Sequence, residues 1–355
     1  MAQATSIPAG TCVTIISACR NEIQHIGAFL ESIAAQRMGP LDWEVIIADG
    51  MSNDGTRDYI ADFCHRNRRF QVIRNPGRIV STGLNAAIRV ASGDIIIRMD
   101  AHTHYSPDYC VKCVETLLAT GADNVGGPAR TKSKGVVPRA VAAAYHSKFS
   151  TGGARFHQPD YEGYVDTVTY GCWRKETLER LGMFDESLVR NQDDELNLRL
   201  VRGGGKIWQS PAIVSWYSPR PDLHSLFRQY FQYGFWKVAV IRKHGQPGSW
   251  RHLVPAAFVA GNALLAVAAL MGLILGSKLP LWAFLAVFGS YALANIAASI
   301  AAARQGGWDT LPFLPFVFGA YHFSYGSGFL MGLAQPAGKS GTPLPVESVY
   351  TKLSR

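Results

Sequence analysis

The chain has 355 residues, enough for one large or two ordinary domains. A hydrophobic content of 48% excludes a disordered chain, and a charged content of 17% is low for a purely soluble protein. The formal net charge is +9, but the region from Leu253 to Ala337 contains only three charged residues, Lys278, Arg304 and Asp309. Composition therefore predicts a globular domain followed by a membrane module.

Short apolar runs alternate with amphipathic segments along the N-terminal part of the chain. Strands are predicted at 12–17, 43–48, 70–73 and 94–97, and helices around 26–33, 56–66 and 81–91. Strands that alternate with helices are typical of βαβ units, which form a mainly parallel sheet. The strands are apolar without interruption, which indicates burial on both faces. Residues 1–10 contain no Lys or Arg, so no signal peptide is expected and this domain should stay in the cytosol.

Polar residues follow three of these strands at their carboxyl ends, where ligands bind in open α/β sheets. They are Arg20-Asn-Glu22, Asp49 and Asp100-Ala-His102. A third acidic station, Asp193-Asp-Glu195, opens a predicted helix that ends at Gly203. The alternative is purely structural, since Asp is common in turns and carboxylates stabilise helix N-termini.

The C-terminal part has three apolar runs, at 253–276, 279–303 and 311–334. The first two are long enough to cross a hydrocarbon core of about 30 Å. Arg242-Lys-His244 and Arg251 precede the first run, so the positive-inside rule places that end in the cytosol.

The third run contains Pro312, Pro315 and His322, and it is compatible with a span, a re-entrant segment or an interfacial segment. If it crossed the membrane, the tail with Lys339 and Lys352 would lie outside, against the positive-inside rule.

Several motifs together resemble family 2 glycosyltransferases, and they cover about residues 11 to 210 in the order that this family has. They are the 13–17 strand with Arg20-Asn-Glu22, the turn from Ala48 to Thr56, Asp100-Ala-His102, Tyr170-Gly-Cys-Trp-Arg174, Gly182-Met-Phe-Asp-Glu186 and Asp193-Asp-Glu-Leu-Asn-Leu-Arg199. With the apolar C-terminal part, the layout is similar to succinoglycan-type bacterial exopolysaccharide glucosyltransferases. The resemblance implies a GT-A, Rossmann-like fold, a nucleotide-sugar donor, a divalent metal and an inverting mechanism.

The resemblance also implies roles for single residues on the donor side. Asp49, with Asn21 and Glu22, would bind the nucleotide of a UDP-sugar. Asp100 would be the first acid of the family's DxD motif, and His102 replaces the second acid. The pair would hold Mn²⁺, or Mg²⁺ through the diphosphate, because imidazole suits Mn²⁺ better than Mg²⁺.

On the acceptor side, Asp193 matches the acid of the family's ED motif, although Gln192 replaces its Glu. It would be the general base that deprotonates the acceptor hydroxyl, and Asp194 would contact the acceptor. Arg78 is a candidate for stabilising the leaving diphosphate, with a solvated turn arginine as the alternative.

A weaker match lies further along, at Gln232-Tyr-Gly-Phe-Trp236, where polysaccharide synthases of this family carry QxxRW. Phe235 replaces the Arg, which argues against a processive synthase. Gln232 and Trp236 would bind the acceptor, and the alternative is an aromatic helix at the membrane interface.

The sequence thus predicts a cytosolic GT-A catalytic domain (1–225), an amphipathic interfacial region (226–252), a membrane module with two or three spanning helices (253–337) and a tail (338–355). The expected activity is transfer of a sugar, glucose, from a UDP-sugar to a polyprenyl-diphosphate-linked acceptor at the bacterial inner membrane. Sugar transfer directly to polyprenyl phosphate is an alternative, and a non-catalytic membrane scaffold is another. Nucleic-acid binding is not expected, because the positive charge has a membrane explanation and no nucleic-acid module is present.

Overall fold

The computed structural model describes residues 7–335. The expected tail 338–355 lies outside them, as do residues 1–6 of the stretch predicted to lack a signal peptide. The described chain forms two compact units. The sheet unit comprises 7–131 and 155–218, and the helical unit comprises 132–154 and 219–335. Residues 132–154 thus leave the sheet unit in mid-sequence and belong with the C-terminal helices.

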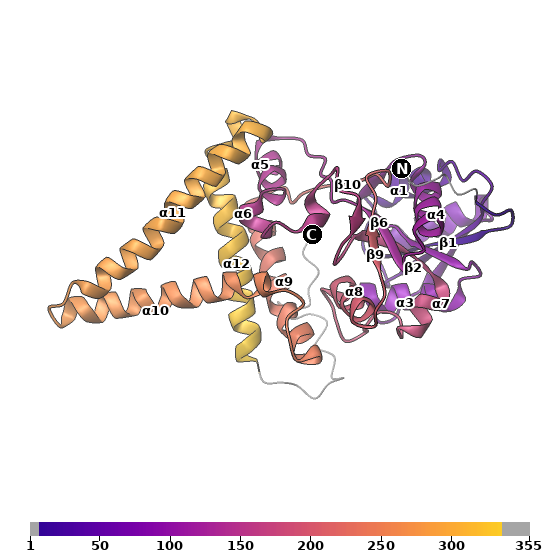
Figure 1. The fold of residues 1–355 in the computed structure, drawn as a ribbon. Coiled ribbons are helices and arrows are strands. Elements are labelled where there is room, and N and C mark those ends of the chain that lie inside the picture. Colours follow the sequence, from indigo (N-terminus) through magenta and orange to yellow (C-terminus); the bar gives the residue numbers. More distant parts are fainter. Residues whose placement is uncertain (1–6, 336–355) are drawn as a thin grey trace. The chain divides into compact units, whose positions relative to one another are not determined.

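The centre of the sheet unit is an eight-stranded sheet in the order β3-β2-β1-β4-β8-β6-β9-β7 (Figure 1). The strands are β1 (Cys12–Cys19), β2 (Asp42–Asp49), β3 (Phe70–Arg74), β4 (Ile95–Arg98), β6 (Asn124–Gly127), β7 (Gly163–Tyr164), β8 (Thr169–Arg174) and β9 (Ile207–Gln209). The β1–β2, β1–β4, β2–β3 and β6–β9 pairs are parallel, while β8 is antiparallel to β4 and β6, and β7 to β9. A separate pair joins β5 (Thr103–Tyr105) to β10 (Ser215–Tyr217). The predicted α/β fold with a mainly parallel sheet is confirmed.

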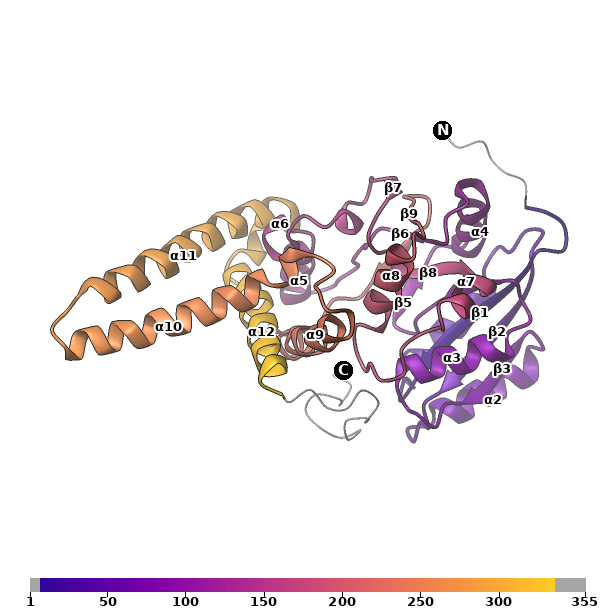
Figure 2. The same cartoon turned by 60° about the horizontal axis from the view of Figure 1, so that its bottom comes forward.

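Helices cover both faces of this sheet (Figure 2). One apolar cluster includes side chains of α1 (Ile26–Ala34), α2 (Thr56–Arg66) and α4 (Tyr109–Thr120). The other includes side chains of α3 (Val80–Val90), α7 (Lys175–Arg180) and α8 (Gln192–Arg202). A short 3₁₀ helix, η1, spans Arg155–His157. Burial on both faces explains the uninterrupted apolar strands, since Ile15 faces one cluster and Ile16 the other.

A glycine in α3 sets how closely this helix approaches the sheet. A Cβ atom on Gly83 would lie 2.8 Å from the Cβ of Ala18 and 3.3 Å from the Cβ of Ala48. Only a residue without a side chain fits there, so α3 packs directly over the carboxyl ends of β1 and β2. The candidate site lies at this edge of the sheet.

The helical unit consists of six α-helices in the described part of the chain. They are α5 (Val136–Tyr145), α6 (Lys148–Thr151), α9 (Leu223–His244), α10 (Val254–Ile274), α11 (Leu279–Gly306) and α12 (Leu314–Ala334), with 3₁₀ turns η2 (Trp250–His252) and η3 (Trp308–Thr310). Within this unit, α10 and α11 lie side by side as a hairpin that extends away from α5, α9 and α12 (Figures 1 and 2).

Two helical segments are long and apolar enough to cross a membrane, Trp250–Ile274 and Leu279–Gly306. In the most apolar 18-residue stretch of each segment, only 17% and 11% of the residues are buried, so most of the side chains face outward. They correspond to the first two predicted apolar runs. The third run forms α12, and its residues Val317, Phe318 and Tyr321 are buried in a core shared with α5 and α9.

Candidate active site

The loops after β1 and β2 are held together by local hydrogen bonds at the carboxyl edge of the sheet. Parallel pairing places Cys19 beside Asp49, so the residues that follow both strands meet there. Asn21 has a left-handed backbone (φ 57°), its amide donates to Ser52 Oγ at 2.9 Å, and its Oδ1 accepts from the amide of Asn53 at 3.1 Å. The Glu22 amide donates to Thr56 Oγ1 at 2.7 Å, and the Glu22 side chain is buried.

Asp49 is the last residue of β2 and is fully buried. Both of its carboxylate oxygens accept from the amide of Ser52, at 3.3 and 3.2 Å. The predicted group Asn21, Glu22 and Asp49 is therefore assembled around one rigid turn.

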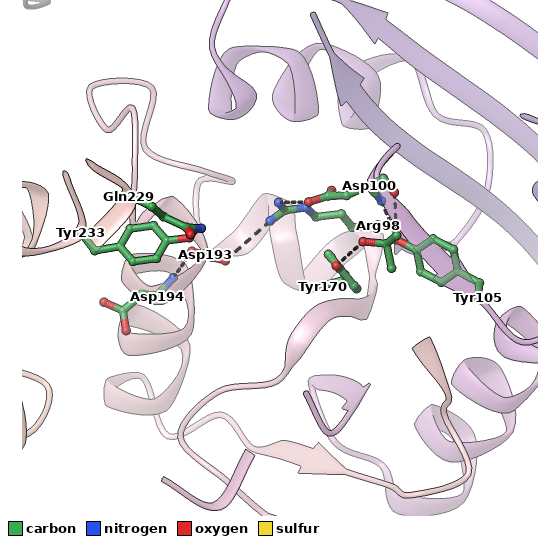
Figure 3. A network of polar contacts seen from close by, with 9 residues as sticks. Arg98, Asp100, Tyr105, Tyr170, Asp193, Asp194, Gln229 and Tyr233 are labelled. Carbon is green, nitrogen blue, oxygen red and sulfur yellow. Dashed lines mark hydrogen bonds and ion pairs between the residues drawn. The ribbon is translucent and has the colours of Figure 1, made fainter. Parts of the chain in front are cut away.

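Arg98 is the most heavily engaged charged residue at this edge. It is the last residue of β4 and is 5% exposed. Its Nε and Nη2 donate to the two oxygens of Asp100, each at 2.9 Å, a bidentate ion pair (Figure 3). Burial by itself lowers the pKa of Arg98, but the carboxylates of Asp100 and Asp193 outweigh it and raise the pKa. The guanidinium is a permanent cation in the site.

Asp193 approaches the same arginine from the first turn of α8. Its Oδ2 lies 3.9 Å from Arg98 Nη1, and its side chain is 51% exposed, so it is accessible to a substrate hydroxyl. The helix begins after Asn191, which has a left-handed backbone (φ 60°) that turns the chain into α8. Asp193 Oδ1 accepts from the amide of Asp194 at 2.9 Å. Arg98 thus joins two acidic stations that lie far apart in the sequence (Figure 3).

Two tyrosines lie near Asp100 and add no further charge to this part of the site. The Asp100 amide donates to Tyr105 Oη at 2.6 Å, and Tyr170 Oη forms a hydrogen bond with Thr103 Oγ1. The pKa of Tyr105 is raised well above its ordinary value. Burial is the main cause, followed by the neighbouring phenol of Tyr170 and the Asp100 carboxylate. Burial and Asp100 do the same to the pKa of Tyr170. Both phenols therefore stay protonated at neutral pH.

The third acid of the 193–195 cluster has a different environment. Glu195 is fully buried and accepts from Arg199 Nε at 2.8 and 3.0 Å. Arg199 also donates to the backbone oxygens of Leu181 and Met183. This pair fastens α8 to the preceding loop, whereas Asp193 faces solvent.

Possible metal ligands are few at this edge. His102 lies two residues after Asp100, and its ring contacts the ring of Tyr217 edge-to-face with centroids 6.3 Å apart. No group of three or more His, Cys, Asp or Glu side chains suited to a metal occurs among residues 7–335. Asp100 and His102 supply at most two protein ligands, and a bound diphosphate would have to supply others.

The remaining predicted residues belong to other elements of the chain. Arg78 is exposed in the turn before α3, has a left-handed backbone (φ 61°), and its amide donates to Asn75 O at 3.0 Å. Gln232 and Trp236 are buried residues of α9 in the helical unit. In that helix Gln229 Nε2 donates to Tyr233 Oη at 2.9 Å.

Comparison with known proteins decides the family. Residues 14–182 match the model of glycosyl transferase family 2. The chain is 36% identical over 261 residues to the succinoglycan biosynthesis protein ExoA of Rhizobium meliloti, covering 72% of this chain and 79% of that protein. The chain belongs to glycosyl transferase family 2. The predicted family and the prediction that the protein is an enzyme are both confirmed.

More distant similarities are found with a second curated enzyme and with a solved structure. This glycosyltransferase is 28% identical over 239 residues to a Methanococcus voltae enzyme, covering 65% of this chain and 74% of that one. That enzyme is a dolichyl N-acetyl-α-D-glucosaminyl phosphate 3-β-D-2,3-diacetamido-2,3-dideoxy-β-D-glucuronosyltransferase. The mannosyltransferase PcManGT of Pyrobaculum calidifontis, solved with GDP-Man and Mn²⁺, superposes with a TM-score of 0.61 at 20% identity. The alignment covers 91% of this chain and 87% of PcManGT, which supports the predicted GT-A fold.

Arg98 and its tyrosine neighbours are functional candidates of this glycosyltransferase that sequence reasoning missed. A signal was present, because Arg98 interrupts the apolar run Ile95-Ile-Ile97 at a position where a buried strand rarely carries a charge. Tyr170 was part of a recognised motif but had no role attached to it. Its left-handed backbone (φ 63°) is unusual for a bulky residue and marks a constrained position.

Proposed function

We propose that this glycosyltransferase transfers glucose from a UDP-sugar to a polyprenyl-diphosphate-linked acceptor, with inversion at the anomeric carbon, in bacterial exopolysaccharide biosynthesis. The observation that carries this proposal is the Asp100–Arg98–Asp193 arrangement. It places a half-exposed carboxylate and a fixed cation beside the residue that matches the first acid of the DxD motif. The relationship to ExoA supports the pathway, and the name of the Methanococcus enzyme supports a lipid-linked sugar as acceptor.

On the donor side, we assign the nucleotide to the turn that contains Asp49, Asn21 and Glu22. Asp49 is buried and rigidly held, which suits a hydrogen-bond acceptor for a uracil or ribose group. Negative charge grows on the diphosphate as the bond to the sugar breaks, so cations aimed at it lower the barrier. Arg98 is such a cation, and Arg78, in its exposed turn, is a second candidate.

Asp100 and His102 suit a divalent metal, Mn²⁺ or Mg²⁺, but they supply only part of its ligand set. Arg98 occupies one lone pair on each Asp100 oxygen, and a carboxylate has further lone pairs for a metal. Asp100 and His102 would hold the ion together with diphosphate oxygens. When bound, the ion would neutralise charge on the departing nucleotide. Imidazole favours Mn²⁺ over Mg²⁺ in such a set.

On the acceptor side, Asp193 acts as the general base. Its carboxylate takes the proton from the acceptor hydroxyl as the hydroxyl oxygen attacks the anomeric carbon from the face opposite the nucleotide. Glu195 is unsuited to this role because Arg199 engages both of its oxygens. We assign acceptor contacts to Asp194, Gln232 and Trp236 on the match to the family's motifs.

The membrane supplies the lipid-linked acceptor. We propose that α10 and α11 cross the bacterial inner membrane as a hairpin, with the sheet unit in the cytosol. Leu264, Val267 and Leu270 of α10 are each more than 60% exposed, a pattern that suits lipid rather than water. Arg242, Lys243 and Arg251 precede the hairpin, and each cation near an anionic surface is worth about 1 kcal/mol of attraction.

A donor and acceptor screen tests the proposal. Membranes containing the protein are incubated with UDP-glucose, UDP-galactose or GDP-mannose and with polyprenyl-diphosphate-linked monosaccharide or bare polyprenyl phosphate. Membranes with Asp193→Asn are the control. The expected product is a glucose-containing disaccharide lipid made from UDP-glucose. A monosaccharide lipid phosphate would replace the proposal with direct transfer to polyprenyl phosphate, and no product from any pair would favour the scaffold alternative.

A further inference from the structure

Helix α12 is apolar and 21 residues long, yet its contacts within the helical unit differ from those of a membrane span. Nine of its residues are buried, from Leu314 to Gly332, whereas α10 and α11 each bury four. The segments that α12 contacts therefore indicate whether it crosses the membrane. The argument rests on the proposed function in one respect, namely that α10 and α11 span the membrane.

Helix α12 lies against α9 from Tyr321 to its C-terminal end. Tyr230 and Tyr321 have ring centroids 4.3 Å apart, and a Cβ on Gly328 would lie 2.0 Å from Phe231 O. Further along, a Cβ on Gly332 would lie 2.8 Å from Phe235 O. Because residue numbers rise together in these contacts, the two helices run side by side in the same direction.

Helix α9 starts directly after the sheet unit and ends before the first span, so both of its ends are on the cytosolic side. It ends in Arg242, Lys243 and His244 and carries Arg228 and Lys237 along its length, charges that a spanning helix avoids. The guanidinium of Arg242 donates through Nη2 to Leu333 O, near the C-terminal end of α12, at 2.9 Å. The end of α12 thus lies at the same membrane face as the start of the hairpin.

The start of α12 lies on that face as well. Two spans return the chain to the side from which it left, so Arg304, in the last turn of α11, and Asp309, which follows the hairpin, are cytosolic. Asp309 forms an ion pair with Arg139 of α5. Helix α5 belongs to the segment 132–154, which leaves and re-enters the sheet unit without a candidate span between.

The middle of α12 contacts this same segment. Tyr321 Oη donates to Val141 O at 3.3 Å, and His322 Nε2 lies 2.9 Å from Phe149 O. The turn that precedes α12, the middle of α12 and its end therefore all contact parts of the chain that contain no candidate span.

We infer that α12 does not cross the membrane but lies with α9 at the cytosolic interface, so that the chain has two spans. The large side chains that α12 leaves exposed are apolar and lie near its two ends: Phe316, Met331 and Leu333 are exposed by 67%, 41% and 52%. These exposed ends rest at the level where lipid headgroups meet acyl chains, as interfacial helices do. Lys339 and Lys352 then follow a helix that ends on the cytosolic side. The conflict with the positive-inside rule therefore disappears.

Cysteine labelling in intact cells tests this inference on the full chain. Three single variants carry a thiol at an exposed polar position: Gln246→Cys before the hairpin, Ser277→Cys in its turn, and Gln335→Cys after α12. A membrane-impermeant maleimide is added before and after permeabilisation. The native cysteines, Cys12, Cys19, Cys64, Cys110, Cys113 and Cys172, all lie in the sheet unit, and the unsubstituted protein gives their background.

Ser277→Cys should label equally in both states. Gln246→Cys and its matched partner Gln335→Cys should label about 10-fold more after permeabilisation. If Ser277→Cys and Gln335→Cys both label in intact cells, α12 spans and the inference is overturned, while the proposed hairpin stands. If Ser277→Cys labels only after permeabilisation, the hairpin itself is wrong, and the inference fails with it.

A measurement without substitutions covers the case in which a variant does not insert. Trypsin is added to spheroplasts that contain the unsubstituted chain with an epitope tag at its C-terminus. With two spans, cleavage from outside is confined to the hairpin turn at Lys278, and the tag remains on a fragment that starts there. Loss of the tag from spheroplasts with an intact membrane would show that α12 crosses.

Discussion

At the residue scale, the chemistry of this enzyme depends on carboxylates whose environments differ. Asp193 is half exposed, Asp100 is clamped by Arg98, and Glu195 is buried against Arg199. Only the first is open to an incoming hydroxyl. We therefore propose separate tasks for two acids of one sequence cluster, a chemical one for Asp193 and a structural one for Glu195.

The general base is tested by Asp193→Asn. The amide cannot accept the proton, so kcat should fall by about 10² or more while donor affinity stays nearly unchanged. Turnover with saturating donor and lipid acceptor, and donor titration by calorimetry, provide the two measurements. Asp194→Asn is the matched control and should retain more activity. Near-normal turnover of Asp193→Asn would move the base elsewhere.

Arg98 is tested by comparing two replacements. Lysine keeps the charge but lacks the planar fork that engages both Asp100 oxygens, so Arg98→Lys should lose about 10-fold in kcat/KM. Arg98→Met removes the charge as well and should lose at least another factor of ten. Arg89→Met provides the control, because Arg89 lies in the last turn of α3 and forms an exposed ion pair with Glu186. Equal activity of the lysine and methionine variants would contradict a role for the cation.

The metal is tested at His102. Replacing imidazole with a carboxylate makes the ligand set harder, so His102→Asp should shift preference from Mn²⁺ towards Mg²⁺. Donor binding measured by calorimetry with each ion gives a readout that does not depend on turnover. Donor binding that is insensitive to chelator in the unsubstituted protein would remove Asp100 and His102 as metal ligands.

At the element scale, the alternation of strands and helices was readable from the sequence. The predicted strands and helices of the N-terminal part differ from the observed ones by no more than two residues at either end, and α2 has the predicted bounds. Continuous apolar strands and glycine- or aspartate-rich turns are local signals. The contact between Arg98 and Asp193 is not local, because sheet and helix packing brings together residues far apart in the chain. No spacing rule predicts such a pair.

The packing of α12 could not be predicted from the sequence either, because an apolar run has the same composition whether lipid or protein surrounds it. Two glycines in α12 have different surroundings, and they show where the helix packs against protein. A Cβ on Gly328 would lie 2.0 Å from Phe231 O, whereas a Cβ on Gly319 would meet nothing within 4 Å. The first glycine is required by a close helix contact, and the second is not.

These glycines give a matched pair of variants. Gly328→Ala should destabilise the helical unit by about 1–3 kcal/mol, because α9 and α12 must move apart. Gly319→Ala should be neutral or stabilise by up to about 1 kcal/mol through helix propensity. Thermal unfolding in detergent, followed by circular dichroism, measures both. Equal midpoints for the two variants would show that the contact at Gly328 is absent in solution.

At the scale of the whole molecule, the division into units changes what a truncation should do. A chain that ends after Arg251 keeps Asp49, Asp100 and Asp193, and about 250 residues are ample for a stable domain. It also keeps α5 and α9 but lacks α12, which covers Val141 and Leu226. We expect it to bind donor with unchanged affinity but to aggregate unless detergent is present.

Calorimetry in detergent and sedimentation without it measure these two properties. Transfer to a lipid-linked acceptor should drop sharply, since proximity to the membrane no longer concentrates the acceptor. Full-rate elongation by the truncated chain would show that the helices are only an anchor. Loss of donor binding by a folded truncated chain would place part of the donor site outside the sheet unit.

The excursion of residues 132–154 into the helical unit also has a consequence for biosynthesis. Tyr321, which donates to Val141 O, is made 180 residues later. At about 5–20 residues per second, the ribosome needs roughly 9–36 s to cover that distance. Throughout this interval the apolar side of α5 has been synthesised but its partner has not. The nascent enzyme therefore completes its fold only after α10 and α11 have been made, so the proposed membrane insertion of these two helices would come before the fold is complete.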